Sequence, residues 1–240
     1  MRELAHRAQE AEEIRDLVIS MISHELRTPL HAVGLGLDVL LTRVRVDAKQ
    51  QEWLIDKLTK CRRAVTRLEQ LVESLLTVSQ LAAGRLNLVR EEVDLGDVVK
   101  RVVDSNTEEL QWAGCRIDVS MAGALSGQWD RARLGLVVQN LLSNAVKYGP
   151  GQPVEVRAEG TEQAVTLTVT DHGRGVPRDD QERIFGKFER LPSNTRVPGL
   201  GLGLWLVRQF VEAMGGRIEV RSAGGHGASF VVRLPKSKEA

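Results

Sequence analysis

Apolar residues in the first third of the chain recur at alternating spacings of four and three positions. One series comprises Leu26, Leu30, Val33, Leu37, Leu40 and Val44, and the other comprises Leu54, Leu58, Cys61, Val65, Leu68, Val72 and Leu75. Such heptad stripes are typical of long helices that pack against other helices. A short polar segment separates the two series, so we predict an antiparallel helical hairpin with helices over residues 4–45 and 49–80.

The predicted hairpin would leave much of each apolar stripe in contact with water. A second hairpin is the natural cover, because helical bundles bury such stripes between four helices. We therefore predict that residues 1–82 form a dimerisation domain, a four-helix bundle built from two copies of the chain. The alternative is that the C-terminal half of the same chain covers the stripes.

The pattern changes after Gly84, where helical and strand-like segments begin to alternate. Expected strands cover residues 86–90, 116–121, 154–160, 164–170, 217–223 and 228–235, and expected helices cover residues 95–112, 131–147 and 202–214. Asp94 and Asp130 precede two of these helices, where an aspartate can cap the first turn. Helices interleaved with strands, several of them antiparallel neighbours, predict an α/β layered domain over residues 83–240.

The composition and net charge of the chain argue against several classes of function. The 240 residues carry a net charge of +1, which argues against a general nucleic-acid or membrane-surface role. Two cysteines are too few for a disulfide framework or a zinc site, which favours a reducing compartment. No apolar run approaches the ~18 residues of a membrane span, and no signal peptide heads the chain. We expect a cytoplasmic protein with no membrane segment in this chain and no nucleic-acid partner.

A pair of asparagines and a lysine mark the helix expected at residues 131–147. In "NLLSNAVKYG", Asn140 and Asn144 share one helix face, and Lys147 lies three positions further on. A carboxamide oxygen is a hard ligand suited to Mg²⁺, and a lysine ammonium suits a phosphate. The alternative is a pair of surface asparagines, but asparagine is a poor helix former and two on one face weigh against it.

Two glycine-rich segments follow. In "DHGRGVP", Asp171 ends an apolar strand, where a carboxylate can accept a hydrogen bond from an amine such as that of adenine. Gly173 and Gly175 permit positive φ and close approach to a flat ligand. In "PGLGLGLWLV", three glycines lead into a helix whose N-terminus suits a triphosphate. This segment lacks the Lys-Ser/Thr of a Walker A loop and the preceding strand of a dinucleotide fingerprint.

The order of these clusters, with "FGKF" at residues 185–188 between the second and third, resembles the ATP-binding domain of sensor histidine kinases. Their N, G1, F and G2 boxes occur in this order, on the α/β-sandwich ATPase fold called the Bergerat fold. "SHELRTPL", residues 23–30, is similar to the phospho-acceptor H box of the same family. The resemblance extends from about residue 14 to residue 235, and it implies an ATP-dependent protein-histidine kinase that uses Mg²⁺.

The resemblance also implies roles for individual residues. Asn144 would bind Mg²⁺ with Asn140 assisting, and Asp171 would bind the adenine amine, with room for the base at Gly173 and Gly175. The expected contacts with the rest of the nucleotide come from Lys147, Tyr148, Lys187, Arg190, Gly199, Gly201 and Gly203. Two features depart from the family pattern. Leu200 replaces a small hydroxyl residue, and the lid from Glu189 to Pro198 is short, with two prolines and no glycine.

His24 is the expected nucleophile. A neutral imidazole can attack phosphorus directly, and in the family's mechanism the adjacent Glu25 takes the proton from its other ring nitrogen. His31 lies on nearly the same helix face, but its neighbour is Ala32 and it lacks this base. Pro29 removes the backbone donor that would bond to the carbonyl of Glu25, so we expect a bend beside the histidine.

The family passes its phosphoryl group to an aspartate on a response-regulator receiver domain, which this chain does not contain. The pattern from His24 to Thr28 also matches members that dephosphorylate their regulator, in which Thr28 would position the attacking water. Two alternatives stay open. One is a degenerate kinase that acts as a dimeric scaffold, and the other is a Bergerat-fold ATPase that drives conformational work, which typically uses a glutamate where Asn140 stands.

Overall fold

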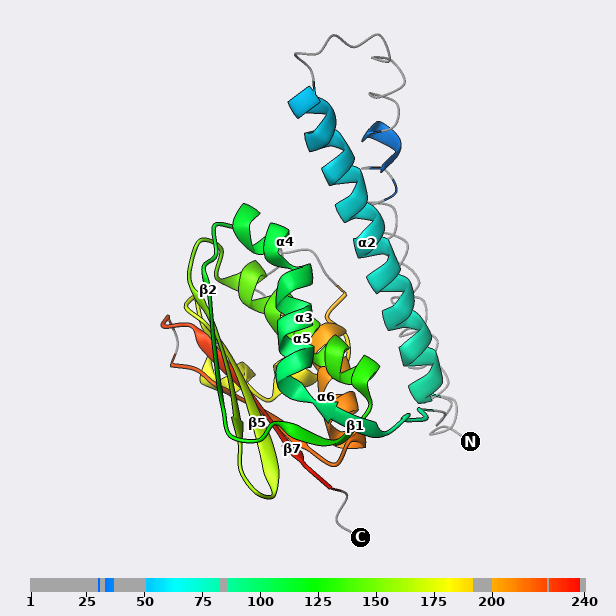
Figure 1. Cartoon of the computed structure of the whole chain (residues 1–240). Coiled ribbons are helices and arrows are strands. Elements are labelled where there is room, and N and C mark those ends of the chain that lie inside the picture. The colour runs from blue at the N-terminus through cyan, green and yellow to red at the C-terminus, as the bar shows by residue number, and fades with distance from the viewer. Residues whose placement is uncertain are drawn as a thin grey trace, which may run out of the picture. The chain divides into compact units, whose positions relative to one another are not determined.

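The computed structural model describes residues 30, 33–36, 51–82, 86–191, 200–223 and 225–237 (Figure 1). The chain divides into two compact units, and the boundary between them falls at residues 85 and 86.

The first unit contains the long helix α2, Gln51–Ala82, which confirms the second helix of the predicted hairpin and runs two residues beyond it. Of the first predicted helix, only residues 30 and 33–36 lie within the described residues, and they are helical. Sγ of Cys61 in α2 lies 3.9 Å from the carbonyl oxygen of Val33. Gly36 has no room for a Cβ because the same sulfur occupies that position. This small residue therefore lets the chain approach α2 closely.

The second unit is built on a five-stranded mixed sheet with the strand order β2-β4-β5-β7-β6. Its strands are β2 (Ile117–Ala122), β4 (Val154–Gly160), β5 (Ala164–Asp171), β6 (Arg217–Arg221) and β7 (Ala228–Pro235). Strand β2 pairs with β4 in parallel, and all other pairs are antiparallel. Strands β1 (Glu91–Asp94) and β3 (Ser126–Trp129) form a separate two-stranded sheet.

Helices pack on one face of the larger sheet (Figure 1). They are α3 (Leu95–Ser105), α4 (Thr107–Trp112), α5 (Arg131–Tyr148) and α6 (Gly203–Ala213), with short 3₁₀ turns η2 (Arg178–Asp180) and η3 (Arg183–Phe185). Both predicted caps are confirmed. Asp94 accepts a hydrogen bond from the amide of Asp97 at 3.2 Å, and Asp130 accepts one from the amide of Arg133 at 2.9 Å. Each cap satisfies a donor that the first helical turn leaves unpaired.

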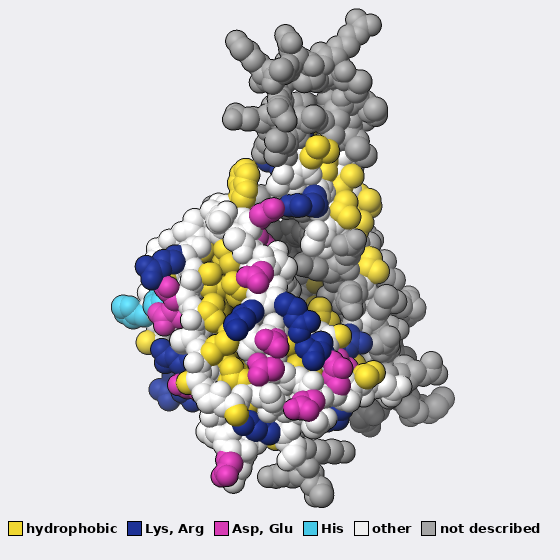
Figure 2. Space-filling model, viewed as in Figure 1, with side chains coloured by type: hydrophobic (Ala, Val, Ile, Leu, Met, Phe, Trp, Pro, Cys, Tyr) yellow, Lys and Arg dark blue, Asp and Glu magenta, His cyan; other side chains and the backbone are white. Residues whose placement is uncertain are grey.

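The core lies between the sheet and these helices. Alternate residues of β4 and β5 face the helices and are buried, as Val156 and Val169 show, while Glu155 and Thr168 lie on the other face. This period of two follows from the pleat of a strand. Acidic and basic side chains are interspersed over the visible surface of this unit, so neither sign of charge dominates that face (Figure 2).

Two local expectations are wrong, and one strand was not expected. Residues 86–90 form no strand, because the amide of Val89 bonds to the carboxylate of Asp130 at 2.9 Å instead of to a neighbouring strand. The helix expected over residues 95–112 is divided into two helices. The side-chain Nδ2 of Asn106 donates a hydrogen bond to the carbonyl of Val102 at 2.6 Å, and such a local side-chain bond competes with continuation of the helix. The third difference is strand β3, which was not expected because four residues are too few to show an alternation of apolar and polar positions. This strand exists because β1 pairs with it.

Candidate functional site

An open cleft lies in the second unit, where α5, β5, β7 and the start of α6 converge. Four of the residues singled out in the sequence line it, namely Tyr148, Asp171, Gly175 and Arg190. Its other walls are largely apolar, formed by Val176, Ile184, Leu191, Leu204, Ala228 and Phe230. An apolar cleft with a few polar groups is the usual form of a site for a small flat ligand.

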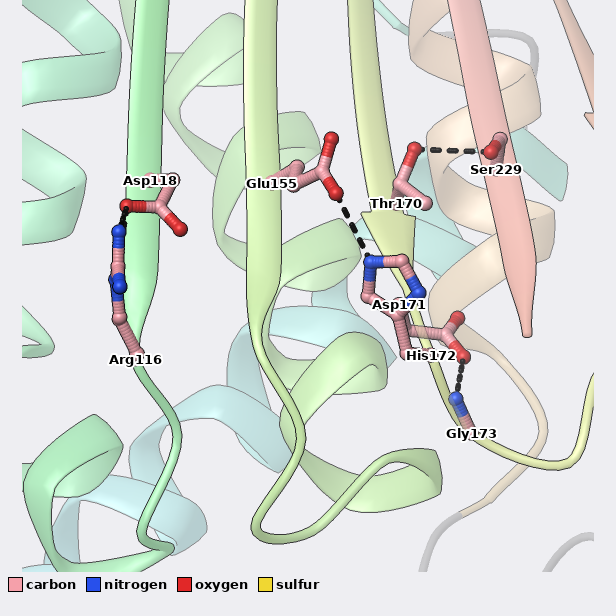
Figure 3. A network of polar contacts seen from close by, with 8 residues as sticks. All are labelled: Arg116, Asp118, Glu155, Thr170, Asp171, His172, Gly173 and Ser229. Carbon is pink, nitrogen blue, oxygen red and sulfur yellow. Dashed lines mark hydrogen bonds and ion pairs between the residues drawn. The ribbon is translucent and has the colours of Figure 1, made fainter. Parts of the chain in front are cut away.

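Asp171 is the buried polar group of this cleft. It is the last residue of β5, only 4% exposed, and its Oδ1 accepts a hydrogen bond from the amide of Gly173 at 2.9 Å (Figure 3). Burial raises the pKa of its carboxyl group, and hydrogen bonds from the amides of Gly173 and Ala228 and the nearby His172 partly offset that rise. A buried carboxylate in a cleft is a strong acceptor for a ligand's N–H donor.

His172, the next residue, points away from the cleft's buried acid. Its Nε2 lies 2.9 Å from Oε1 of Glu155, and both side chains are exposed on the open side of the sheet (Figure 3). A nearby hydroxyl pair, Thr170 and Ser229 at 2.9 Å, links β5 to β7 on the same face (Figure 3). The end of β5 is thus fixed on both sides of Asp171.

The two glycines after Asp171 are required by the protein's own packing. A Cβ on Gly173 would collide with the carbonyl oxygen of Tyr148, which ends α5. Gly175 has a φ of +71°, and a Cβ there would lie 2.7 Å from Oγ of Ser222. The loop therefore passes close to the end of α5 and to the turn that follows β6.

Ser222 is a residue of this site that sequence reasoning missed. Its hydroxyl accepts a hydrogen bond from the amide of Val176 at 2.8 Å and donates one to the carbonyl of Gly227 at 2.6 Å. The side-chain amide of Gln181 bonds to the carbonyl of Ser222 at 2.9 Å. These bonds join the loop after β5 to the β6–β7 connection. A lone serine after a strand carries no sequence signal for such a role.

Cationic residues lie along the cleft beside Tyr148. The guanidinium of Arg174 lies 6.0 Å from the Tyr148 ring centroid, and Arg190 lines the cleft directly. Burial raises the pKa of Tyr148, and the charges of Arg190 and Arg174 partly offset that rise. The phenol therefore stays protonated near neutral pH and can donate a hydrogen bond.

Asn140 joins α5 to the start of α6. Its Nδ2 donates to the carbonyl of Leu136 at 2.8 Å, which turns Oδ1 toward Gly203, the first residue of α6. Asn144 lies one turn further along α5 and is half-buried. Within the described part of the chain its carboxamide makes no hydrogen bond to protein. Lys147 is exposed in the last turn of the helix. These three residues lie outside the lining of the apolar cleft.

The "FGKF" segment meets the glycine-rich segment through its backbone. Phe188 has a φ of +63°, and Gly201, with a φ of +67°, packs against it so closely that a Cβ on Gly201 would lie 2.8 Å from the carbonyl carbon of Phe188. Lys187 is exposed, and its ammonium lies over the rings of Phe188 and Trp205. Segments that are apart in sequence are therefore joined at the N-terminus of α6.

Some predicted site residues lie outside the described residues, namely His24, Glu25, Thr28 and Gly199, as does most of the predicted lid. Among the described residues, no group of three or more His, Cys, Asp or Glu side chains is placed to hold a metal ion. The described helices include none that is both long enough and apolar enough to cross a membrane.

Two family models match the chain in succession. Residues 14–84 match the model described as "His Kinase A (phospho-acceptor) domain". Residues 129–238 match the model described as "Histidine kinase-, DNA gyrase B-, and HSP90-like ATPase".

Curated relatives and solved structures agree with these matches. The sensor protein KdpD of Mycobacterium tuberculosis is 34% identical over 97% of this chain, which spans 28% of KdpD. The full-length structure of ShkA in complex with AMPPNP is 27% identical with a TM-score of 0.65, covering 92% of this chain and 45% of ShkA. A mycobacterial sensor histidine kinase structure, MprB, is 30% identical with a TM-score of 0.55, covering 62% of this chain and 99% of MprB. The chain, with its phospho-acceptor match followed by an ATPase match, therefore belongs to the sensor histidine kinases of two-component systems.

Proposed function

We propose that this chain binds ATP in the cleft of its second unit and transfers the γ-phosphoryl group to His24. The observation that carries the proposal is the buried carboxylate of Asp171 in an apolar cleft, in a chain whose residues 14–84 match a phospho-acceptor domain. In the two-domain arrangement that we propose, residues 1–82 carry the nucleophile and residues 83–240 carry the nucleotide.

Asp171 would bind the exocyclic amine of adenine. Its Oδ1 already accepts from the amide of Gly173, and a carboxylate has further lone pairs for a second donor. The apolar walls at Val176, Ile184 and Phe230 suit the faces of a purine ring. The binding of AMPPNP by ShkA, a relative in fold and sequence, supports an adenine nucleotide as the ligand.

The phosphates would lie toward α5 and the N-terminus of α6. Asn144 has an uncommitted carboxamide among the described residues, and Oδ1 of Asn140 faces the start of α6, so two hard oxygen ligands suited to Mg²⁺ lie along one helix face. Bound Mg²⁺ would neutralise phosphate charge during transfer. Lys147, Lys187 and Arg190 would add positive charge, and Gly199, Gly201 and Gly203 would bring backbone amides close to the phosphates.

His24 would perform the transfer. Its unprotonated ring nitrogen attacks the γ-phosphorus, a P–N bond forms, the bond to the β,γ-bridging oxygen breaks, and ADP leaves with that electron pair. Glu25 takes the proton from the other ring nitrogen. The phosphohistidine then passes its phosphoryl group to an aspartate of a separate response regulator, and Thr28 would position water in the opposing phosphatase reaction. Pairing of two copies through the predicted hairpin would supply the four-helix bundle.

Labelling with γ-³²P-ATP and Mg²⁺ tests this function. We expect label on the protein that is labile in acid and stable in alkali, as a phosphohistidine is, and we expect none on His24→Gln. His31→Gln is the matched control, because it removes a histidine on nearly the same predicted face and should keep the label. Label that persists on His24→Gln would disprove the assignment of the nucleophile.

Further measurements in the same experiment distinguish a kinase from a scaffold that only binds ATP and from a simple ATPase. Binding of ATP without any labelled protein would favour the scaffold, and phosphate release without phosphohistidine would favour the ATPase. Chase of the labelled protein with a receiver domain should move the label to a species that is labile in alkali, as an acyl phosphate is.

A further inference from the structure

We propose that Trp205 is a positioning residue that holds the ammonium of Lys187 for the terminal phosphate of the nucleotide. The inference rests on the proposed function, since it requires that Lys187 serve a bound triphosphate. It adds a side chain of α6 to which neither the sequence motifs nor the family match gives a role.

The rings of Trp205 and Phe188 both lie near the ammonium of Lys187, and we call this arrangement the aromatic clip of Lys187. Its Nζ lies 5.3 Å from the ring centroid of Trp205 and 5.4 Å from that of Phe188, both within the range of a cation–π interaction. Indole is the most effective aromatic partner for a cation. A lysine side chain has four rotatable bonds, so two rings restrict a cation that would otherwise sample many positions.

Both rings are themselves held in place. Trp205 is half-buried in the first turn of α6, and its neighbour Leu204 lines the cleft. Phe188 has a left-handed backbone, which is rare for a bulky residue and indicates a conformation imposed by its surroundings. The close approach of Gly201 to the Phe188 carbonyl supplies that constraint. The clip is therefore built into the junction between the "FGKF" segment and α6.

The position of the aromatic clip suits a contact between Lys187 and the phosphate end of the nucleotide. Lys187 is exposed and is absent from the lining of the cleft, whereas Glu189 and Arg190, two and three positions further along the chain, belong to it. The ammonium of Lys187 therefore lies outside the lining that suits a purine. The N-terminus of an 11-residue helix adds the positive end of its dipole beside Trp205. A preorganised cation there would contribute most to the phosphate that lies furthest from the base.

The test compares the affinities of ATP and ADP for the full chain by calorimetry. Trp205→Leu should weaken ATP binding about two- to fivefold, the size of one partly exposed cation–π contact, and should leave ADP binding within about twofold. Trp205→Phe, which keeps an aromatic face, should recover most of the ATP affinity. Lys187→Met should weaken ATP binding by at least as much as Trp205→Leu.

The double variant Lys187→Met with Trp205→Leu decides whether Trp205 acts through the lysine. Without the ammonium, the Trp205→Leu change should have no further effect on ATP affinity. The proposal is overturned if Trp205→Leu weakens ATP and ADP equally, or if its effect persists in the Lys187→Met background. The proposed function is judged separately, because it fails if the unaltered chain does not bind ATP or if Asp171→Asn binds ATP as well as the unaltered chain does.

Discussion

Oδ1 of Asn140 lies 2.8 Å from the position that a Cβ of Gly203 would occupy. The start of α6 therefore packs against the middle of α5 with no side chain of residue 203 between them. The Asn140 side chain is not free to move aside, because its Nδ2 bonds to the carbonyl of Leu136 at 2.8 Å. One contact thus fixes the distance between a proposed metal-binding helix and a proposed phosphate-binding helix terminus.

Gly203→Ala is expected to impair ATP binding. The added methyl group must displace Asn140 or push α6 away, and overpacking of this kind costs about 1–3 kcal/mol. We expect ATP affinity to fall about tenfold, measured by calorimetry in the presence of Mg²⁺. Unchanged affinity would show that the spacing of α5 and α6 does not matter for the nucleotide.

Gly135→Ala is the matched control for that change. Gly135 lies in the same helix as Asn140, and a Cβ at this position would have open space around it, with no atom within 4 Å apart from its chain neighbours and the backbone of the helix itself. Alanine in a helix interior is favoured over glycine by about 0.5–1 kcal/mol. The variant should unfold at higher denaturant concentration than the unaltered chain and should keep its ATP affinity.

Asp171→Asn should separate ligand binding from stability. The amide oxygen can still accept from Gly173, but the charge that strengthens a bond to the adenine amine is lost, and hydrogen bonds to charged groups are worth about 1.5–3 kcal/mol. We expect ATP affinity to fall about tenfold or more. The free energy of unfolding without nucleotide, measured near pH 7, should be no lower than that of the unaltered chain, because the charge is costly to bury.

The pH dependence of stability gives a second test of Asp171. Burial raises its pKa in the folded chain above the ordinary 3.8, so between these values the folded state binds more protons than the unfolded state. The free energy of unfolding contributed by this group therefore decreases as pH rises through that interval. Asp171→Asn lacks the effect, so its stability relative to the unaltered chain should increase across the interval in denaturant titrations without nucleotide. A constant difference would count against a raised pKa.

Ser222→Ala should loosen the loop that follows Asp171. The amide of the buried residue Val176 loses its acceptor, and an unpaired buried donor costs about 1–3 kcal/mol. We expect lower stability in denaturant titrations and weaker ATP binding, with faster amide exchange at Val176. Ser120→Ala, an exposed change on β2, should alter stability by no more than about 0.5 kcal/mol.

Removal of the two helix-capping aspartates should lower the free energy of unfolding by different amounts. Asp130 is 6% exposed and accepts from the amides of both Arg133 and Val89, so Asp130→Ala leaves two donors unpaired and should cost about 2–4 kcal/mol. Asp94 is half-buried and caps α3 through one amide, so Asp94→Ala should cost about 1 kcal/mol. Thermal or chemical unfolding measures both. Because Asp94 also accepts from the hydroxyl of Ser126 at 3.3 Å, equal costs would count against a stabilising contribution from the bond to Val89.

The periodic parts of the fold could be predicted because each depends on local geometry. The heptad stripe from Leu54 to Leu75 predicted α2, and alternation predicted β4 and β7 with their observed bounds. Helix starts at Asp94 and Asp130 followed from capping, which involves residues only three positions apart. The strand expected over residues 164–170 also placed Asp171 at a strand end, where the structure has it.

The rest depends on contacts between distant residues. Strand β3 exists because β1 pairs with it, and neither β2 nor β4 alone indicates that the two strands pair in parallel. Asn106 interrupts a helix because its side-chain amide donates to the carbonyl of Val102 and, in a second bond, to the side chain of Gln139. Ser222 bonds to Val176, which lies 46 positions earlier in the chain, and Trp205 contacts Lys187, which lies 18 positions earlier. Neither contact can be read from the residues next to Ser222 or Trp205.

Most helices and strands, the family and the candidate chemistry could thus be derived from the order of the residues, because periodicity, capping and motif order are properties of neighbouring positions. Folding in three dimensions was needed to bury Asp171 in an apolar cleft, to pack Gly203 against Asn140, and to bring two rings to Lys187. Burial, exclusion of a side chain and cation–π contact all require atoms from different segments to meet, and that information lies in the packing of the folded chain.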